Sequence, residues 1–248
     1  MSKQPILLDI DTDFMWKKDW QYLEWDELPG ISITGKTLGR HLKRFKGKDT
    51  KVFIVIDHHQ ALYWWDKFGI KNAYCIHIDA HHDMWATGTA QSRRIGNRTR
   101  KITCGNYLQQ ALIDNIVQQV LYVPPDYKTC ADELKDLRSH SAIGYRPTML
   151  SRIRLQRWKT FVKQKPSKAD IITIAISPEW SPRKYWKEIQ DLCSTFGVSI
   201  HTMRHKYWKA NTKWEILRTK GYVRYKDDYA FPYSMRKLSP KTELKTHK

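Results

Sequence analysis

Short apolar runs alternate with stretches of helical spacing along most of the chain, and this alternation limits the folds open to it. The runs that read as strands are rich in β-branched and aromatic residues, and they lie at 5–10, 51–57, 72–79, 117–124, 169–177 and 198–203. The intervening helical patterns lie at 35–45, 61–69, 106–116, 130–139 and 181–197. Strands that alternate with helices form a mostly parallel sheet covered on both faces. The sequence therefore predicts a three-layer α/β/α fold.

The last predicted helix carries the clearest boundary signals. Ser181 is a candidate N-cap, Pro182 suits the first helical position, and Gly197 is a typical helix end. We therefore expect one helix from Ser181 to Gly197.

The domain organisation follows from length and composition. The chain has 248 residues, and 41% of them are hydrophobic, which is enough for a substantial core. No internal repeat and no clear linker divides it. We expect one catalytic domain over residues 1–235 and a polar tail over 236–248 that frays.

The cysteines and the apolar runs bear on the compartment. The four cysteines form no CxxC pair, which argues against a thiolate zinc site and a disulfide framework. No apolar run reaches the roughly 20 residues that cross a bilayer, and the N-terminus lacks the pattern of a signal peptide. The sequence predicts reduced thiols, no membrane partner and a cytoplasmic location.

Three of the predicted strands end in clusters of acidic residues and histidines. These ends read LLDIDTDF at 7–14, FIVIDHHQ at 53–60 and CIHIDAHHD at 75–83. The ends of parallel strands share one edge of the sheet, and such folds bind ligands at that edge. We therefore expect the three clusters to converge.

The spacing within the first cluster indicates a bound cation. Asp9, Asp11 and Asp13 lie on one face if the strand continues through them, because successive side chains of a strand point to opposite sides. Three carboxylates on one face repel each other unless a cation neutralises them.

The third cluster repeats this spacing with a histidine included. Asp79, His81 and Asp83 stand two residues apart. Carboxylates and imidazoles without cysteine suit Mn²⁺, Fe²⁺ or Zn²⁺, and a majority of carboxylates favours Mn²⁺. One such cluster alone is more often a helix cap or a solvated loop. Three clusters at strand ends that point the same way make a metal site the better interpretation.

The remaining histidines have no comparable setting. We interpret five of them as surface or packing residues: His41, His140, His201, His205 and His247.

The three motifs resemble those of a known family. DAHHD is similar to the DAHxD signature of the arginase and agmatinase ureohydrolases, IDHH resembles their GGDH strand end, and DIDTD resembles their SxDxD motif. The likeness is closest to the UPF0489 family, in particular to its peptide arginase branch, and it covers mainly the first 110 residues and the strand near 170–182. It implies an arginase/deacetylase-like α/β/α fold.

The resemblance also implies a site for two Mn²⁺ ions. Asp79 and Asp11 would bridge the ions, whereas Asp9 stands at the serine of SxDxD and would contact ligands and not the metals. The six implied metal ligands are Asp11, Asp13, His58, Asp79, His81 and Asp83.

Further motifs of the family imply substrate contacts. The family has an ExNP segment whose glutamate grips the substrate guanidinium, and this chain has PEWSP with Glu179 in that place. A carboxylate matches the fork of a guanidinium on chemical grounds as well. The family motif SGNxH corresponds to CGNYL here, so Cys104 and Asn106 are implied to touch the substrate.

The chain departs from the family pattern in two ways. Leu108 stands where SGNxH has the histidine that carries protons, so His82, His59 or solvent would have to replace it. The DxD element also precedes the other motifs here and follows them in arginase, which requires a different order of strands. Asp13 is the remaining implied catalytic residue, as a support for the tetrahedral intermediate.

The implied reaction converts arginine side chains to ornithine and urea in a ribosomally made precursor peptide. Lys and Arg outnumber Asp and Glu by 44 to 25, and the net charge of +19 favours a partner that is acidic over a small cation such as free arginine. We therefore expect an arginine-containing precursor with an acidic leader, bound by the basic and aromatic segments 145–165 and 204–235. Solvated faces and core aromatics are the alternative interpretation of these segments.

Other functions fit the sequence less well. A metal-dependent phosphoesterase or nuclease of the DHH type also combines an early DxD with a strand ending in DHH, and a basic surface suits it. Its first motif usually continues into small residues, whereas this chain has DTDFMWKKDW. A small-molecule ureohydrolase is a further alternative. A nucleic-acid-binding protein without activity would have no use for the acidic clusters, so the sequence argues against a nucleic acid partner.

Overall fold

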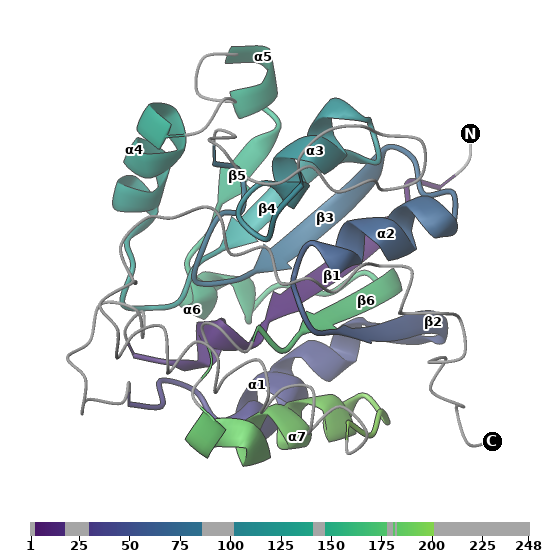
Figure 1. The fold of residues 1–248 in the computed structure, drawn as a ribbon, viewed down its shortest axis with the longest axis vertical. Coiled ribbons are helices and arrows are strands. Elements are labelled where there is room, and N and C mark those ends of the chain that lie inside the picture. Colours follow the sequence, from purple (N-terminus) through teal and green to yellow (C-terminus); the bar gives the residue numbers. More distant parts are fainter. Residues whose placement is uncertain are drawn as a thin grey trace.

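The computed structural model describes residues 3–17, 30–85, 102–140, 147–177, 181 and 183–200. In this part of the chain, six strands form a single sheet in the order β2-β6-β1-β3-β4-β5, and every neighbouring pair is parallel (Figure 1). The strands are β1 (Ile6–Asp11), β2 (Lys46–Val55), β3 (Ala73–Ile78), β4 (Val117–Val123), β5 (Ile153–Leu155) and β6 (Ala169–Ala175).

Helices pack on both faces of this sheet. The cluster of apolar side chains on one face includes residues from α2 (Gln60–Lys67), α3 (Tyr107–Ile113), α4 (Cys130–His140) and α5 (Pro147–Leu150). The cluster on the other face includes residues from α1 (Gly35–Leu42), α6 (Trp158–Phe161) and α7 (Trp186–Thr195). The described residues also form the short 3-10 helices η1 (Thr12–Met15), η3 (Lys43–Phe45) and η4 (Arg183–Tyr185). The predicted three-layer α/β/α fold is confirmed.

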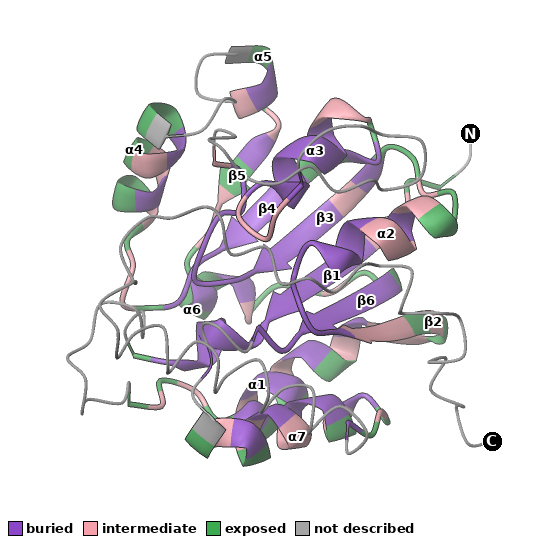
Figure 2. Ribbon diagram, viewed as in Figure 1, coloured by how far each residue is buried: buried purple, intermediate pink, exposed green. Residues whose placement is uncertain are grey.

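The central strands send alternate side chains to the two faces. In β1, Leu7 joins the cluster under α2 and α3, whereas Leu8 and Ile10 join the cluster under α1 and α7. Figure 2 shows β1, β3 and β6 buried over most of their lengths. Because Asp9 shares the parity of Leu7, the acidic side of β1 faces α2 and α3. The carboxylates of β1 therefore lie on this side of the sheet.

Some predicted elements differ from those observed. β2 starts at Lys46, earlier than predicted, and β5 was not predicted, because its three residues include the exposed Arg154. Residues 198–200 are not in a strand, whereas 201–203 lie outside the described residues. The predicted tail at 236–248 also lies outside them.

The last helix begins later than its sequence signals indicate. α7 starts at Trp186, after η4, and its N-cap position is Tyr185. Ser181 does not cap it; its Oγ instead lies 2.9 Å from Oγ1 of Thr12, in a hydrogen bond between buried hydroxyls. The N-cap prediction for Ser181 was therefore wrong, because a long-range partner holds its side chain. Pro182 lies outside the described residues.

In the described part of the chain, none of the helices has the length and apolar character that a bilayer crossing requires.

The close packing of α1 against α7 gives a prediction about stability. A Cβ atom added at Gly35 would lie 1.8 Å from the main-chain oxygen of Glu188, so the two helices would have to move apart. We expect Gly35→Ala to lower the free energy of unfolding by about 3 kcal/mol, the upper end of the usual cost of overpacking. Urea denaturation checks this. Gly69→Ala is the comparison, because its added Cβ meets no atom within 4 Å, although its φ of +65° adds some strain. If Gly35→Ala were as stable as the parent chain, this would contradict the close packing of α1 against α7.

Candidate metal centre

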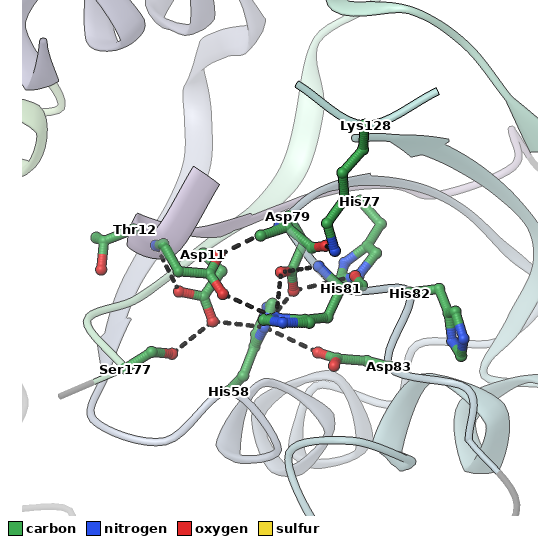
Figure 3. Close-up of polar contacts among 12 residues, drawn as sticks. Asp11, Thr12, His58, His77, Asp79, His81, His82, Asp83, Lys128 and Ser177 are labelled. Atoms are coloured by element: carbon green, nitrogen blue, oxygen red, sulfur yellow. Dashed lines mark hydrogen bonds and ion pairs between the residues drawn. The ribbon is translucent and has the colours of Figure 1, made fainter. Parts of the chain in front are cut away.

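The six implied ligands come together at the carboxyl-terminal edge of the sheet, and all of them are buried. Asp11 ends β1, His58 follows β2 after a short loop, and Asp79 follows β3 directly. The three strand ends therefore converge as predicted. Figure 3 shows side chains from these ends pointing toward one another around His58.

Turns that follow β1 and β3 place the remaining ligands. β1 ends at Asp11, and η1 redirects the chain so that the Asp13 N–H donates to Asp11 Oδ1 at 3.0 Å. β3 ends before Asp79, whose Oδ1 accepts from the His81 N–H at 2.7 Å, and Asp83 has a left-handed φ of 50°. The prediction that strand alternation brings Asp13, His81 and Asp83 to the site was wrong, because local turns do this.

His58 is the centre of the first set of ligands. Its Nδ1 atom lies 3.1 Å from Asp11 Oδ2, 3.0 Å from Asp79 Oδ2 and 3.1 Å from Asp83 Oδ2. These four atoms belong to three different strand ends. One imidazole nitrogen and three carboxylate oxygens therefore face one small volume.

His81 is the centre of the second set. Its Nδ1 atom lies 2.9 Å from Asp13 Oδ2 and 3.8 Å from Asp79 Oδ1. The other oxygen of Asp13 accepts from the Ala80 N–H at 3.2 Å, which fixes the carboxylate. Asp79 thus presents Oδ2 to His58 and Oδ1 to His81, and it is common to both sets.

The chemistry of these residues fits metal ions. His58 Nδ1 and Asp79 Oδ2 are buried atoms with no hydrogen bond of acceptable geometry, although they lie close together. Buried polar atoms rarely stay in that condition unless another group satisfies them. The ligand atoms of Asp11, His58 and Asp79, and those of Asp13, Asp79 and His81, lie within 4.8 Å of one another. These buried groups could hold metal ions.

The carboxylates of the cluster destabilise one another when no cation is bound. Burial, followed by the charges of Asp13, Asp83 and Asp11, raises the pKa of Asp79 well above its usual range. Burial and the charge of Asp13 likewise raise the pKa of Asp11. For Asp13, burial acts in the same direction, but the hydrogen bond and charge of His81 outweigh it and lower the pKa. Asp79 is therefore the carboxylate that most needs a positive partner.

The charged forms of His58 and Asp9 stabilise each other. Burial disfavours the imidazolium form of His58, but Asp9 and the contacts to Asp11, Asp79 and Asp83 raise its pKa well above the usual value. Burial also opposes ionisation of Asp9, yet His58 and then His77 lower the pKa of that carboxyl far below its usual range. Asp9 is thus a buried anion behind the cluster.

A row of polar side chains crosses the sheet behind the ligands. The strand register aligns Asp9 with Thr173 of β6 and with His77 of β3, and His77 with Tyr122 of β4. All four are buried. Asp9 accepts hydrogen bonds from its two neighbours in the row, with Thr173 bonded to Oδ1 and His77 Nδ1 at 3.1 Å from Oδ2. Asp9 contacts a ligand, as the resemblance implies, and both of its oxygens accept hydrogen bonds.

Sequence reasoning missed three residues of this region. His77 lies inside the predicted strand at 72–79; it stands two residues before Asp79 and thus on the same face, which was the available signal. Tyr107 donates to Asp9 at 2.5 Å, and Ser177 donates to Asp11 Oδ2 at 2.5 Å. Both contacts join residues far apart in the sequence, so only the fold reveals them.

Lys128 brings a positive charge to the same loop. Its ammonium group donates to the main-chain oxygen of Ala80, between two ligands, and lies 3.6 Å from Glu133 Oε1. Figure 3 shows it extending toward the cluster from the opposite side to His58. The Lys128 side chain is 18% exposed, so the charge is only partly screened by water.

The two candidate proton carriers lie in different places. His82 accepts the Met84 N–H at its Nδ1, at 3.0 Å, and pairs through Nε2 with Asp136 at 2.8 Å, so both ring nitrogens are engaged away from the cluster. His59 is buried at the N-cap position of α2, next to His58. His82 thereby ties the ligand loop to α4, and its catalytic role stays a prediction.

The CGN loop packs against the ligand loop. The Trp85 N–H donates to the Gly105 main-chain oxygen at 2.9 Å. Asn106 is buried, and its Oδ1 accepts the Thr103 N–H at 2.9 Å at the start of α3, while Cys104 is partly exposed. Leu108 lies in the hydrophobic core under α2 and α3. The position that corresponds to the family's histidine is therefore a packing position here.

The guanidinium-binding residue implied by the resemblance, Glu179, lies outside the described residues. Its described neighbours are anchored at the cluster. Ser177 bonds to Asp11, and the Ser181 N–H donates to the Ser177 main-chain oxygen at 3.0 Å. Ser181 also bonds to Thr12, between two of the implied ligands.

Of the five histidines interpreted as surface or packing residues, the structure describes the side chain of one. His41 is partly exposed and packs edge-on against Trp158, with ring centroids 5.8 Å apart, which confirms its assignment.

Comparison of the chain with models of known protein families, with curated proteins and with solved structures finds no match.

Proposed function

We propose that the protein is a metal-dependent hydrolase that converts arginine side chains of a peptide to ornithine and releases urea. The observation that carries this proposal is the pair of histidine and carboxylate sets that share Asp79. Each oxygen of Asp79 faces a different histidine, at 3.0 Å from His58 Nδ1 and 3.8 Å from His81 Nδ1. A carboxylate shared in this way suits two cations that act on one substrate.

The charge of the cluster supports two divalent cations. Its four carboxylates carry four negative charges when all are ionised, and two divalent cations balance them. A single divalent cation would balance only two of these four charges, and buried charges that are not balanced are costly. Oxygen ligands in the majority favour Mn²⁺. The four carboxylates are those of Asp11, Asp13, Asp79 and Asp83.

The reaction itself is a hydrolysis of a C–N bond. When bound, two such cations lower the pKa of water so that hydroxide forms near neutral pH. A C–O bond forms at the guanidinium carbon, the C–N bond to the side-chain nitrogen breaks, and a proton passes to the departing amine. In our proposal Glu179 orients the guanidinium through paired hydrogen bonds, and Asp13 supports the tetrahedral intermediate. His82, His59 and solvent are the candidate proton sources.

Cys104 and Asn106 complete the proposed substrate contacts. Asn106 is held by its bond to Thr103 and leads into α3, whose first residue, Tyr107, contacts Asp9. The loop therefore sits beside the residues that support the cluster. The four cysteines are free thiols, which supports a reducing compartment such as the cytoplasm.

A peptide with an acidic segment is the proposed form of the substrate. Residues 151–168 contain seven basic residues and no acidic one. The aromatic rings within this stretch, Trp158 and Phe161, are buried, so it offers charge without exposed rings for stacking on bases. This composition favours an acidic peptide over a single-stranded nucleic acid. It also favours a peptide over free arginine, because a basic surface repels a small cation.

One observation favours a second candidate, a phosphoesterase. The Lys128 ammonium group lies beside the loop that carries Asp79 and His81. A cation near a two-metal site stabilises a phosphate, whereas it does not help to bind a guanidinium. Lys128 is, however, already engaged with Ala80 and Glu133.

Mass spectrometry of a peptide distinguishes the two candidates. The protein loaded with Mn²⁺ is incubated with an arginine-containing peptide that carries an acidic N-terminal segment, and in parallel with an oligonucleotide. Hydrolysis of each guanidinium should lower the peptide mass by ~42 Da, and a colorimetric assay should detect urea. The Asp79→Asn variant should leave the peptide unchanged. Cleavage of the oligonucleotide without any change to the peptide would replace the proposed function by the phosphoesterase.

A further inference from the structure

We propose that Asp9 is a positioning residue that holds His58 in the tautomer required for metal binding, and that His77 keeps Asp9 in place. This inference rests on the proposed metal centre and deepens it, because it assigns a role to a buried carboxylate that is not itself a proposed ligand. It concerns residues of the row that crosses the sheet behind the site.

The geometry of the His58 ring gives the first step. Its Nε2 atom lies 3.1 Å from Asp9 Oδ2, while Nδ1 faces the carboxylates of the first set. A neutral imidazole carries one N–H, and a carboxylate can only accept a hydrogen bond. Asp9 therefore retains the proton on Nε2 and leaves the lone pair of Nδ1 directed at the metal position. Histidine ligands commonly have such a partner on their other nitrogen.

The surroundings of Asp9 give the second step. Besides His58, Oδ2 accepts from the Tyr107 hydroxyl at 2.5 Å and from His77 Nδ1 at 3.1 Å, and Oδ1 accepts from Thr173. Four donors from four separate segments of the chain thus surround one carboxylate that has no exposed surface. A carboxylate held by this many donors cannot rotate without breaking several buried hydrogen bonds.

His77 joins this arrangement to the second set. Its Nδ1 faces Asp9, and its Nε2 lies 3.0 Å from the main-chain oxygen of His81. Asp9 therefore contacts the ring of His58 directly, whereas it reaches the other ligands through His77, whose Nε2 lies 3.0 Å from the main-chain oxygen of His81 and 3.3 Å from Asp79 Oδ2. We expect the loss of Asp9 to weaken the metal position at His58 much more than the position at His81.

Titration of the metal-free protein with Mn²⁺ tests this asymmetry. Asp9→Asn keeps the size of the side chain but removes its charge. It also replaces one acceptor oxygen by an NH₂ group, which donates hydrogen bonds and does not accept them. One of the two ions should bind ~10- to 100-fold more weakly, as is typical when a partner of a ligand is lost, and the other should bind as before. Asp170→Asn is the matched control, because it makes the same change at an exposed carboxylate that accepts from the Ile6 N–H at the other end of the sheet, and it should change neither affinity.

A measurement on the unaltered chain keeps the proposal testable if Asp9→Asn does not fold. In protein labelled with ¹⁵N-histidine and loaded with Zn²⁺, nitrogen-proton correlation spectra should show the His58 proton on Nε2, assigned by its disappearance in His58→Asn. A proton on Nδ1 would overturn the inference, and so would equal weakening of both ions, or of neither, in Asp9→Asn. Both readouts are independent of turnover. Normal metal binding without arginine conversion would therefore reject the proposed reaction and leave the role of Asp9 intact.

Discussion

Replacement of Asp79 by asparagine is expected to remove both metal ions and all metal-dependent activity. Asp79 offers one oxygen to each set of ligands, so the change affects both positions at once. A metal ion at 100 times its dissociation constant stabilises a folded protein by about 2.7 kcal/mol per site, and this stabilisation should vanish at both sites in Asp79→Asn. Thermal unfolding with and without Mn²⁺, together with metal analysis of the dialysed protein, measures both effects.

The same variant should be at least as stable as the parent chain when a chelator is present. Burial and the neighbouring carboxylates raise the pKa of Asp79, so its ionised form costs stability at neutral pH when no cation compensates it. Asparagine removes that charge at nearly constant volume. Asp170→Asn is the matched control, since this exposed carboxylate accepts from the Ile6 N–H at the other end of the sheet. Retention of metal-dependent stabilisation by Asp79→Asn would contradict the shared role.

Single replacements of the two histidines should each remove only one ion. His58 belongs to the first set and His81 to the second, and their Nδ1 atoms face different oxygens of Asp79. His58→Ala and His81→Ala should therefore each bind one Mn²⁺ per chain and lose nearly all turnover, because a reaction that requires two cations does not proceed with one. Metal analysis and electron paramagnetic resonance, which distinguishes isolated from paired Mn²⁺, give the count.

His59→Ala serves as the control for this pair. His59 is buried next to His58 but belongs to neither set of ligand atoms, so the variant should keep two ions. Loss of both ions in either His58→Ala or His81→Ala would mean that the two positions are not separate. Loss of none would mean that the histidines are not ligands.

The fold was predictable where one physical signal dominated. The apolar runs of β1, β3 and β6 are buried on both faces, and buried parallel strands carry continuous hydrophobic sequence. β5 escaped prediction because it is a short strand at the edge of the sheet and includes an exposed arginine. The start of α7 was misplaced because Ser181 bonds to Thr12, and no local pattern reveals a partner so far along the chain.

The candidate site was predictable as far as the strands reach. Alternation within β1 correctly joined Asp9 and Asp11, and the common direction of the strands correctly joined the three clusters. Beyond the strand ends, turn geometry decides which way each side chain points, as the left-handed backbone of Asp83 illustrates. His77 was missed because it lies inside an apolar run, although its place two residues before Asp79 puts it on the same face of the strand.

The number of metal ions bound by the unaltered protein tests the central claim most directly. Metal-free protein is dialysed to equilibrium against Mn²⁺, and the bound metal is measured by atomic emission for the parent chain and for Asp79→Asn. Because the two sets of ligands share Asp79, we predict two ions per chain in the parent and none in the variant. A count below two in the parent, or the same count in both proteins, would contradict a two-metal centre built on Asp79.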